Sequence, residues 1–351
     1  MAAPASPAAS LRSSRRARAM PVTLVLTDRD VHALVDSRTA MQVVARAFKA
    51  HSRGQVVMPP KVYLPLPKQS DFRAMAAYMR TPPACGLKWV NVHPHNPARG
   101  LPTVMAVVII NDPATGFPRA ILDGVSITKL RTAAAAAVAA KALARPDSRI
   151  AALIGCGAQA LPQLIMLADT FQLAEVRVWG ARRGEAASFC AAARRRVRRS
   201  IALRPVREIR AGVEGADLIV TLTPSRAPIV QRAWLTPGAH VNAIGADAPG
   251  KQELDPNIVR EATVVVDERE QAIHAGELNV PIRRGQFRPA SIHAELGDVL
   301  IGRAIGRRSP SQITVFDSTG LALHDVAVAR EVVRQAIRQG VGRRMQLFAS
   351  R

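Results

Sequence analysis

The first clear pattern along the chain is an amphipathic helical stretch near the N-terminus. From Thr27 to Ser52 apolar residues recur every three or four positions, the period of one helix face, and Thr27 or Asp28 is a suitable N-cap. Short apolar runs bounded by prolines and turn residues follow, and they predict strands at Val62–Leu66, Gly86–Val92, Thr103–Ile110 and Arg119–Leu122. These elements indicate a first, mixed domain.

Beyond an Ala-rich helical stretch, Thr132–Ala144, the pattern changes. Apolar runs now alternate with helical segments, as in a parallel α/β sheet. The predicted strands are Ile150–Ile154, Glu175–Trp179, Leu218–Leu222, His240–Ile244, Thr263–Val266 and Ile313–Phe316. A last helix is predicted over Asp325–Gln339, and Gly340 is suited to end it. The fold class is therefore α/β with two domains.

A Gly-x-Gly-x-x-Ala motif directly follows the first of these strands and opens a helix, the context of a dinucleotide-binding turn. Gly155 permits the tight turn, Gly157 lets the backbone approach a pyrophosphate, and Ala160 allows close helix packing. Ala158 and Gln159 lie in the same loop. The alternative is a glycine turn without a ligand, but a second strand at the expected distance favours a cofactor site.

The end of that second strand bears on the choice between the nicotinamide cofactors. An acidic residue there binds the ribose 2′-hydroxyl and repels a 2′-phosphate. The sequence reads Trp-Gly-Ala-Arg-Arg and contains no acid, while Arg182 or Arg183 can pair with a phosphate unless both are ordinary surface arginines. The cofactor is therefore expected to be NAD(P), with NADP(H) favoured over NAD(H).

The composition agrees with two domains, and its high positive charge raises the question of a nucleic-acid partner. The 351 residues are 48% hydrophobic, enough for two cores, and carry a net charge of +23 that invites a nucleic-acid interpretation. The excess lies in the tail and in two clusters: Arg194, Arg195, Arg196, Arg198 and Arg199 on one expected helix, and Arg303, Arg307 and Arg308. Aromatic residues for base stacking are few, so we expect a solvated basic surface and no nucleic-acid partner.

Other classes of protein find little support. No apolar run reaches the length of a membrane helix, and the three cysteines lie far apart without a CxxC pair, which fits a cytoplasmic location. His93 and His95 have a metal-like spacing but lack neighbouring cysteine or carboxylate ligands, so we expect hydrogen-bonded imidazoles and no metal site. Residues 1–20 resemble a transit peptide in composition, but we favour a disordered basic tail.

Polar residues within the apolar runs of the first domain need an explanation, because an unpaired buried charge is costly. They belong to the motifs PPKVYL, FRAM, GLKWV and KLRTAA, and the second domain adds IGADAPGK and FDSTGLA. In this order and spacing the motifs resemble the ornithine cyclodeaminase and mu-crystallin family, especially its archaeal-type alanine dehydrogenase branch. The resemblance extends over about residues 27 to 340.

The resemblance implies a domain arrangement and a partner. A substrate-binding and dimerisation domain, residues 21–132, is completed by residues 320–351. A Rossmann NAD(P)-binding domain, residues 133–319, is inserted between them. The expected assembly is a homodimer, and the expected ligand is an amino acid or its keto or imino acid.

The resemblance also implies roles for individual residues at a substrate site. Lys61 and Arg73 would hold the substrate carboxylate, together with Lys88, which would be the central active-site lysine. Arg131 would lie near both this carboxylate and the cofactor pyrophosphate. Asp247 would be the catalytic aspartate. Fixing a carboxylate and managing a proton are what amino-acid oxidation demands of a protein.

On the cofactor side, the resemblance places Thr132 beside Arg131 at the phosphates, and Ser318 and Thr319 near the nicotinamide. The favoured function is NAD(P)-dependent oxidation of a small amino acid, alanine to pyruvate and ammonia. Two enzymes are alternatives, an ornithine cyclodeaminase with bound NAD and an NADPH-dependent reductase of cyclic imino acids such as pyrroline-2-carboxylate. A crystallin-like binding protein without turnover is a third, which the retained Lys88, Arg131 and Asp247 disfavour.

Overall fold

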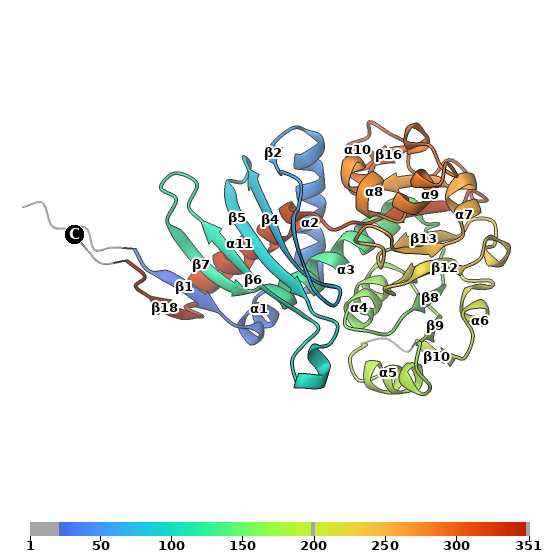
Figure 1. Cartoon of the computed structure of the whole chain (residues 1–351), viewed down its shortest axis with the longest axis horizontal. Coiled ribbons are helices and arrows are strands. Elements are labelled where there is room, and N and C mark those ends of the chain that lie inside the picture. The colour runs from blue at the N-terminus through green and yellow to red at the C-terminus, as the bar shows by residue number, and fades with distance from the viewer. Residues whose placement is uncertain (1–20, 198–200, 349–351) are drawn as a thin grey trace, which may run out of the picture.

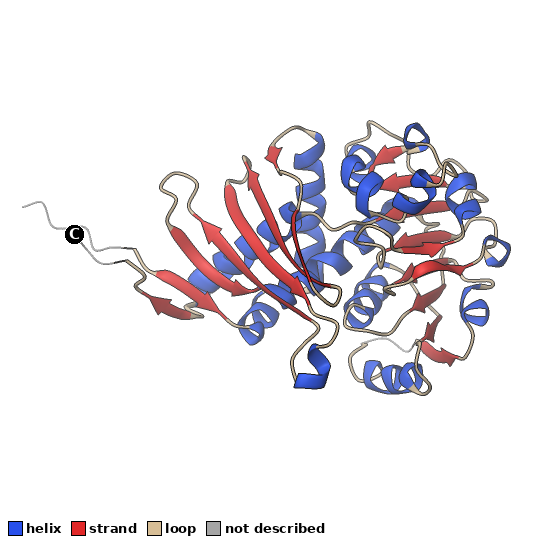
Figure 2. Ribbon diagram, in the orientation of Figure 1, coloured by secondary structure: helices blue, strands red, loops and turns tan. Residues whose placement is uncertain are grey.

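Two large β-sheets organise the chain in the computed structural model, which describes residues 21–197 and 201–348 (Figure 1). The basic tail predicted at 1–20 lies outside the described residues. Helices cover sheet A on one side only, whereas the strands of sheet B lie among helices on both sides (Figure 2). The fold is therefore α/β in two packed parts, as the sequence predicts.

Sheet A is mixed and runs in the order β18-β1-β7-β6-β5-β4-β2, with β3 also paired to β4. Its strands are β1 (Thr23–Leu26), β2 (Val56–Val57), β3 (Val62–Leu66), β4 (Ser70–Met79), β5 (Ala84–Val92), β6 (Val104–Asn111), β7 (Pro118–Asp123) and β18 (Arg343–Met345). Helix α11 (Ala322–Gln339) packs across β4, β5 and β6. The last helix of the chain therefore completes the core of the first part.

Alternation along β4 and β5 determines which side chains point toward α11. Arg73 and Met75 are buried on β4, and Lys88 and Val90 are buried on β5. Met75 is paired with Lys88 in the antiparallel register of the two strands. Because successive strand residues point to opposite faces, the two cations share the covered face of sheet A.

Sheet B is parallel throughout, in the order β10-β9-β8-β11-β13-β17-β15-β16. Its strands are β8 (Ile150–Ile154), β9 (Glu175–Trp179), β10 (Ala202–Val206), β11 (Leu218–Thr221), β13 (His240–Ala243), β15 (Thr263–Val266), β16 (Ala294–Glu295) and β17 (Thr314–Asp317). The strand order reverses between β8 and β11, and in such sheets ligands bind outside the carboxyl ends of the strands at the reversal. A small separate sheet pairs β12 (Arg226–Val230) with β14 (Gln252–Leu254).

Short helices connect the strands of the second part. They are α4 (Ala160–Thr170), α5 (Glu185–Ala193), α6 (Ile209–Val213), α7 (Pro256–Glu261), α8 (Arg269–Ala275), α9 (Asn279–Arg283) and α10 (Leu296–Leu300), with 3-10 turns η2 (Arg232–Trp234) and η3 (Pro289–Ser291). The 3-10 turn η1 (Asn96–Arg99) belongs to the first part and connects β5 with β6. Among the described residues, none of the helices combines the length and apolarity that crossing a bilayer requires.

Helix α3 (Gly124–Leu143) joins the two parts. Its alanines from Ala133 to Ala137 are fully buried, and it packs on α2 (Ser37–Ser52) of the first part and on α4 of the second. Small side chains on all faces let neighbouring backbones approach closely. The boundary expected at residue 132 falls inside this continuous helix.

The ten predicted strands are all present, with ends that differ by at most two residues. The pattern missed β4, where alanines alternate with Phe72 and Tyr78 on the uncovered face and give little hydrophobic contrast. It also missed the short strands β1, β10 and β18, of which β10 and β18 lie at sheet edges. A strand is recognised from the sequence only when its alternate positions differ clearly in hydrophobicity, and β4 lacks this difference.

The single helix expected over residues 27–52 is wrong. The chain forms α1 (Asp28–Leu34) and then α2 (Ser37–Ser52), because Asp36 is extended and its side chain accepts the backbone N–H of Thr39 at 2.8 Å. Thr27 caps α1 as predicted. A second cap thus divides one helical pattern into two helices.

Two further helix predictions need correction. The Ala-rich helix begins at Gly124, eight residues before Thr132, because Asp123 accepts the backbone N–H of Ser126 at 2.7 Å and caps it there. Arg194, Arg195 and Arg196 do not lie on the expected helix, since α5 ends at Ala193. Arg198 and Arg199 lie outside the described residues.

Candidate functional site

A buried aspartate organises the centre of the candidate site. Asp325, near the start of α11, is fully buried, and its Oδ2 lies 2.9 Å from Lys88 Nζ on β5. Its Oδ1 accepts a hydrogen bond from Arg131 Nε on α3 at 3.1 Å. One carboxylate therefore holds two of the predicted cations, from two different elements.

Lys88 is 1% exposed and also lies 3.3 Å from the Thr128 hydroxyl on α3. Burial lowers the pKa of Lys88 to about 7, against the attraction of Asp325 and with the added repulsion of Arg131. An amine with a pKa near neutrality can both accept and donate a proton in the physiological range. This is the property that a catalytic lysine requires.

Arg73 connects the first part to the second. Its guanidinium forms a bidentate pair with Asp71, with N–O distances of 2.8 and 3.0 Å, and its Nη1 donates to Asp247 Oδ2 at 3.0 Å. Lys251 Nζ donates to the other oxygen of Asp247 at 2.5 Å. Burial raises the pKa of Asp247, but Lys251 and Arg73 outweigh it and hold that pKa below its usual range. Asp247 is therefore an anion at the junction.

Lys61 precedes β3 and makes a second connection between the parts. Its Nζ donates to the backbone oxygen of Thr319 at 2.6 Å. Burial lowers the pKa of Lys61 to about 8, opposed by Asp267 and Asp247. The positive charges of Arg131 and Arg73 also lower the pKa of Lys61. The four predicted cations thus share one neighbourhood with Asp247.

The loop after β17 is fixed by Asp267, which sequence reasoning did not select. Asp267 accepts hydrogen bonds from the Gly320 backbone N–H at 2.7 Å and from the Thr319 hydroxyl at 3.0 Å, and the Ser318 hydroxyl lies 3.4 Å away. Both predicted hydroxyls therefore point to a buried carboxylate. Burial raises the pKa of Asp267, with Lys61 opposing.

The turn after β8 has the features of a pyrophosphate cradle. Gly155 has φ +110, a conformation that favours glycine, and an added Cβ at Gly157 would meet nothing within 4 Å. One buried oxygen at this turn, Gln159 Oε1, has no hydrogen-bond partner. The turn lies at the reversal of sheet order, between β8 and β11. Open space above a glycine and an unpaired buried oxygen at the reversal fit a dinucleotide.

The end of β9 carries no acid, but an acid from the following helix lies beside it. Glu185, in the first turn of α5, folds back so that its Oε2 accepts the backbone N–H of Arg182 at 3.2 Å. An ideal Cβ at Gly180 would lie 3.1 Å from the same oxygen. Arg182 and Arg183 are exposed beside it. A helix supplies the acid that the strand lacks.

Other predicted residues lie away from ionic contacts. Thr132 is buried next to Arg131 on α3. Ala158 is exposed in the turn after β8, and Ala160 is fully buried at the start of α4, as close packing requires. His93 Nδ1 lies 3.2 Å from Asn91 Oδ1, as expected of a hydrogen-bonded loop, and no group of metal-ligating side chains occurs within the described ranges.

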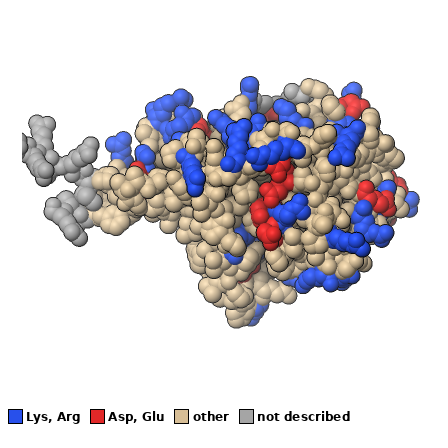
Figure 3. All heavy atoms as spheres, turned by 90° about the horizontal axis from the view of Figure 1, so that it is seen from above, with Lys and Arg blue, Asp and Glu red and all other residues tan. Residues whose placement is uncertain are grey.

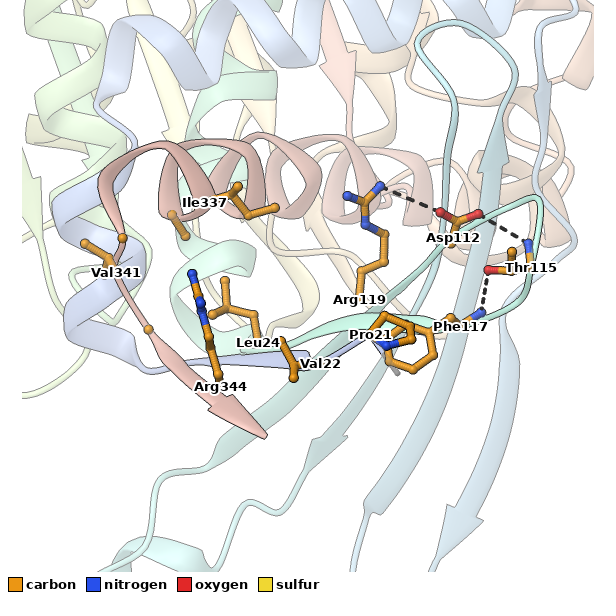
Figure 4. Close-up of a pocket in the computed structure, with 13 residues that line it drawn as sticks. Pro21, Val22, Leu24, Asp112, Thr115, Phe117, Arg119, Ile337, Val341 and Arg344 are labelled. Carbon is orange, nitrogen blue, oxygen red and sulfur yellow. Dashed lines mark hydrogen bonds and ion pairs between the residues drawn. The ribbon is translucent and has the colours of Figure 1, made fainter. Parts of the chain in front are cut away.

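A pocket of about 440 Å³ lies elsewhere, where β1, β18 and the end of α11 meet (Figure 4). Leu24, Ile337 and Val341 line it, and Arg119 lies 3.8 Å from Asp112 at one side. The residues lining it include none of those discussed above. We therefore assign the chemistry to the Lys88 network and not to this pocket.

Charge on the surface is mixed. On the face seen from above, acidic side chains gather in a strip near the middle, with Lys and Arg side chains around it (Figure 3). One member of the expected basic surface is structural instead, since Arg307 Nε donates to the Leu143 backbone oxygen at 2.7 Å and Nη2 to the Thr314 hydroxyl at 3.0 Å. A single continuous basic face is therefore not seen from this side.

Sequence reasoning missed three important acids, and each had a signal. Asp325 interrupts an otherwise apolar helix face in the stretch FDSTGLALHD, and Asp267 directly follows the apolar run Thr263–Val266. Glu185 lies just beyond the second Rossmann strand. An acid at the end of an apolar run, like a cation inside one, indicates a buried charge that needs a partner.

Comparisons with known proteins agree with this geometry. A family model described as the ornithine cyclodeaminase/mu-crystallin family matches residues 21–340. The chain is 46% identical over 326 residues to an alanine dehydrogenase of Archaeoglobus fulgidus, covering 93% of this chain and 99% of that protein.

Two solved structures are similar over nearly the whole chain. An archaeal alanine dehydrogenase dimer with bound NAD has a TM-score of 0.89 at 45% identity, covering 93% of this chain and all of that chain. A Δ1-pyrroline-2-carboxylate reductase of Thermococcus litoralis with NADH and L-proline has a TM-score of 0.88 at 32% identity, covering 92% and 99%. The chain therefore belongs to the ornithine cyclodeaminase/mu-crystallin family, and it is an enzyme.

Proposed function

We propose that this enzyme catalyses the reversible, nicotinamide-dependent oxidation of a small α-amino acid, with alanine to pyruvate and ammonia as the specific reaction. The observation that carries the proposal is the buried Lys88–Asp325–Arg131 network, which lies beside Asp247 and the loop after β17. The high identity to an alanine dehydrogenase supports the choice of substrate.

The cations of the site suit an amino-acid carboxylate. Lys61 lies just before β3, Arg73 on β4 and Arg131 on α3. Burial lowers the pKa of Lys61 to about 8, which still leaves it mostly charged at neutral pH. Guanidinium groups bind carboxylates with two parallel hydrogen bonds. We assign the substrate carboxylate to these three residues, which would fix the Cα–H bond relative to the cofactor.

Lys88 and Asp247 divide the proton chemistry. When bound, the nicotinamide accepts or donates the hydride. Neutral Lys88 accepts the proton that the substrate ammonium must lose, and protonated Lys88 returns it in the reverse direction. Asp247, held as an anion by Lys251 and Arg73, orients the attacking water or ammonia. Burial keeps Lys88 away from bulk water, whereas the Asp247 side chain is 37% exposed and accessible to a substrate.

We propose NADP(H) as the favoured cofactor. Arg182 and Arg183 are exposed at the end of β9, where the adenosine ribose lies in Rossmann proteins, and position 180 is glycine. Replacing both arginines by alanine is expected to raise the KM for NADPH much more than that for NADH. An equal rise for both would contradict the preference.

A substrate panel tests the function. Purified enzyme is assayed with pyruvate, ammonia and NADPH or NADH, with ornithine and catalytic NAD, and with pyrroline-2-carboxylate and NADPH. We expect turnover with pyruvate and ammonia. Reduction of pyrroline-2-carboxylate alone would establish the second candidate, which the likeness to a structure holding L-proline favours. Tight cofactor binding without any turnover would refute both.

We also propose a homodimer that forms through the uncovered side of sheet A. Val62 and Leu64 on β3, Trp89 on β5 and Val107 on β6 are between 41 and 64% exposed, and Phe72 on β4 stacks on Trp89 with ring centroids 5.1 Å apart. Contiguous apolar surface of this kind marks an interface. The five residues are called the open apolar face below.

The proposed location is the cytoplasm. Cys85, Cys156 and Cys190 are free thiols in the structure. Free thiols persist in a reducing compartment.

A further inference from the structure

We propose that Glu185 is a specificity-determining residue that limits the preference of this enzyme for NADP(H) and allows it to use NAD(H) as well. The inference rests on the proposed function, because it requires a nicotinamide cofactor in the Rossmann site. Glu185 lies in the first turn of α5 and not at the end of β9, where Rossmann proteins usually carry the acid that binds the ribose.

The carboxylate borders the space that a side chain on residue 180 would take. An ideal Cβ at Gly180 would lie 2.6 Å from Cys156 Sγ and 3.1 Å from Glu185 Oε2. Glycine at position 180 therefore leaves room for both of these side chains. The strand end carries no acid of its own, and Glu185 brings a carboxylate there from α5.

The surrounding atoms identify this place as the ribose end of the cofactor site. Cys156 stands between Gly155 and Gly157 in the turn after β8, and Gly180 directly follows β9. In Rossmann proteins the adenosine ribose lies between these two turns, and an acid there binds its hydroxyls. Glu185 is thus positioned for that contact.

A backbone contact at the start of α5 holds this side chain in place. Glu185 lies in the first turn of α5 and accepts the backbone N–H of Arg182, three residues earlier, at 3.2 Å, as an acid at a helix N-terminus can. The same turn carries the exposed Arg182 and Arg183. One carboxylate and two guanidinium groups therefore border the position of the 2′ substituent.

These charges act oppositely on the two cofactors. A 2′-phosphate carries about two negative charges near neutral pH, as phosphate monoesters do. It is attracted by the arginines and repelled by Glu185, whereas a 2′-hydroxyl donates a hydrogen bond to the carboxylate. Removal of the Glu185 charge should improve NADPH binding and weaken NADH binding.

The test compares dissociation constants of NADH and NADPH for the wild-type enzyme and for Glu185→Gln. Fluorescence titration measures both, and Trp179 at the end of β9 provides a nearby reporter. We expect Glu185→Gln to lower the NADPH constant about tenfold and to raise the NADH constant a few-fold, the size of one charge-assisted hydrogen bond. Glu185→Asp, which keeps the charge, should remain closer to wild type.

Glu270→Gln is the matched control, since Glu270 is an exposed acid in the first turn of α8. It should leave both constants unchanged. Equal changes for NADH and NADPH in Glu185→Gln would mean that Glu185 only holds the turn, and would overturn the inference. A wild-type enzyme that binds neither nucleotide would instead overturn the proposed function, and this inference with it.

Discussion

At the residue scale, the amino group of Lys88 combines deep burial with a single compensating carboxylate. Asp325 lies 2.9 Å away but also binds Arg131, so its charge is divided between two cations. Burial therefore prevails and lowers the pKa of Lys88 to about 7. The expected consequence is a proton-transfer group that changes its charge near neutral pH.

The first prediction concerns the pH dependence of alanine oxidation. Below pH 7 Lys88 is protonated and cannot accept a proton, so kcat/KM should rise as the pH passes through about 7 and then level off. Lys88→Met should lower kcat by roughly 100-fold or more and abolish the rise. Activity is measured from pH 5.5 to 9, at cofactor concentrations that saturate the enzyme.

Lys61 is the control for this profile, because its pKa is also lowered, to about 8. Lys61→Arg retains a positive charge at the carboxylate and should keep the rise near pH 7, with a change mainly in KM. If the rise in activity disappeared in Lys61→Arg and persisted in Lys88→Met, Lys61 and not Lys88 would be the proton-transfer group.

A second prediction concerns Asp325→Asn. Asp325 raises the pKa of Lys88, so its removal should lower that pKa further and move the rise in activity to lower pH. Stability should also fall by about 3–5 kcal/mol, because Arg131 is left as a buried charge without its partner. Thermal unfolding and the pH profile are measured on the same protein. An unchanged profile would argue against the assigned network.

At the element scale, the loop after β17 depends on Gly320. This residue has φ +80, and an ideal Cβ would lie 2.6 Å from Arg131 Nη1. The loop is also attached to Asp267 through the Gly320 backbone N–H and to Lys61 through Thr319. A side chain at position 320 would therefore displace the guanidinium that Asp325 holds.

The third prediction separates this contact from the cost of the backbone conformation. Gly320→Ala and Gly302→Ala both place alanine at a φ near +80, which costs about 1–2 kcal/mol, but Gly302 has open space around it. Both variants should lose similar stability from strain, and only Gly320→Ala should also lose kcat/KM, by roughly tenfold or more. Equal kcat/KM in the two variants would refute the role of the loop.

At the scale of the whole molecule, the open apolar face exposes several large apolar side chains of sheet A to water. The covered face is buried by α11, whereas Leu64 on the other side is 51% exposed. Leu64 is paired with Phe72 in the register of β3 and β4, and Phe72 stacks on Trp89. A second copy of the chain would bury this stripe.

The fourth prediction follows for assembly. Leu64→Glu should shift the dimer toward monomer at micromolar concentration, because it places an unpaired charge in an apolar interface. Ile305→Glu is the control, since Ile305 is 62% exposed but lies outside the open apolar face. Size-exclusion chromatography with light scattering measures the mass of each. A wild-type monomer, or a dimer that survives Leu64→Glu, would contradict the proposed interface.

Particular elements show what the sequence by itself determined. The strands of sheet B and the turn from Gly155 to Ala160 are readable because each depends on neighbouring residues: an apolar run, a glycine that tolerates φ +110, and a helix start. The cations Lys61, Arg73, Lys88 and Arg131 stand out in the sequence through the resemblance of their motifs to a known family. Local chemistry suffices for such features.

Only the tertiary structure decided how these residues are paired. Asp325 is 194 positions from Arg131 and Asp247 is 174 from Arg73, so no local pattern reports that they meet. Glu185 is close to Gly180 in sequence, yet its reversal onto the strand end depends on the turn between them. The sequence determined which groups are present, and the fold determined which charge faces which, because Coulomb interactions depend on distance in space and not along the chain.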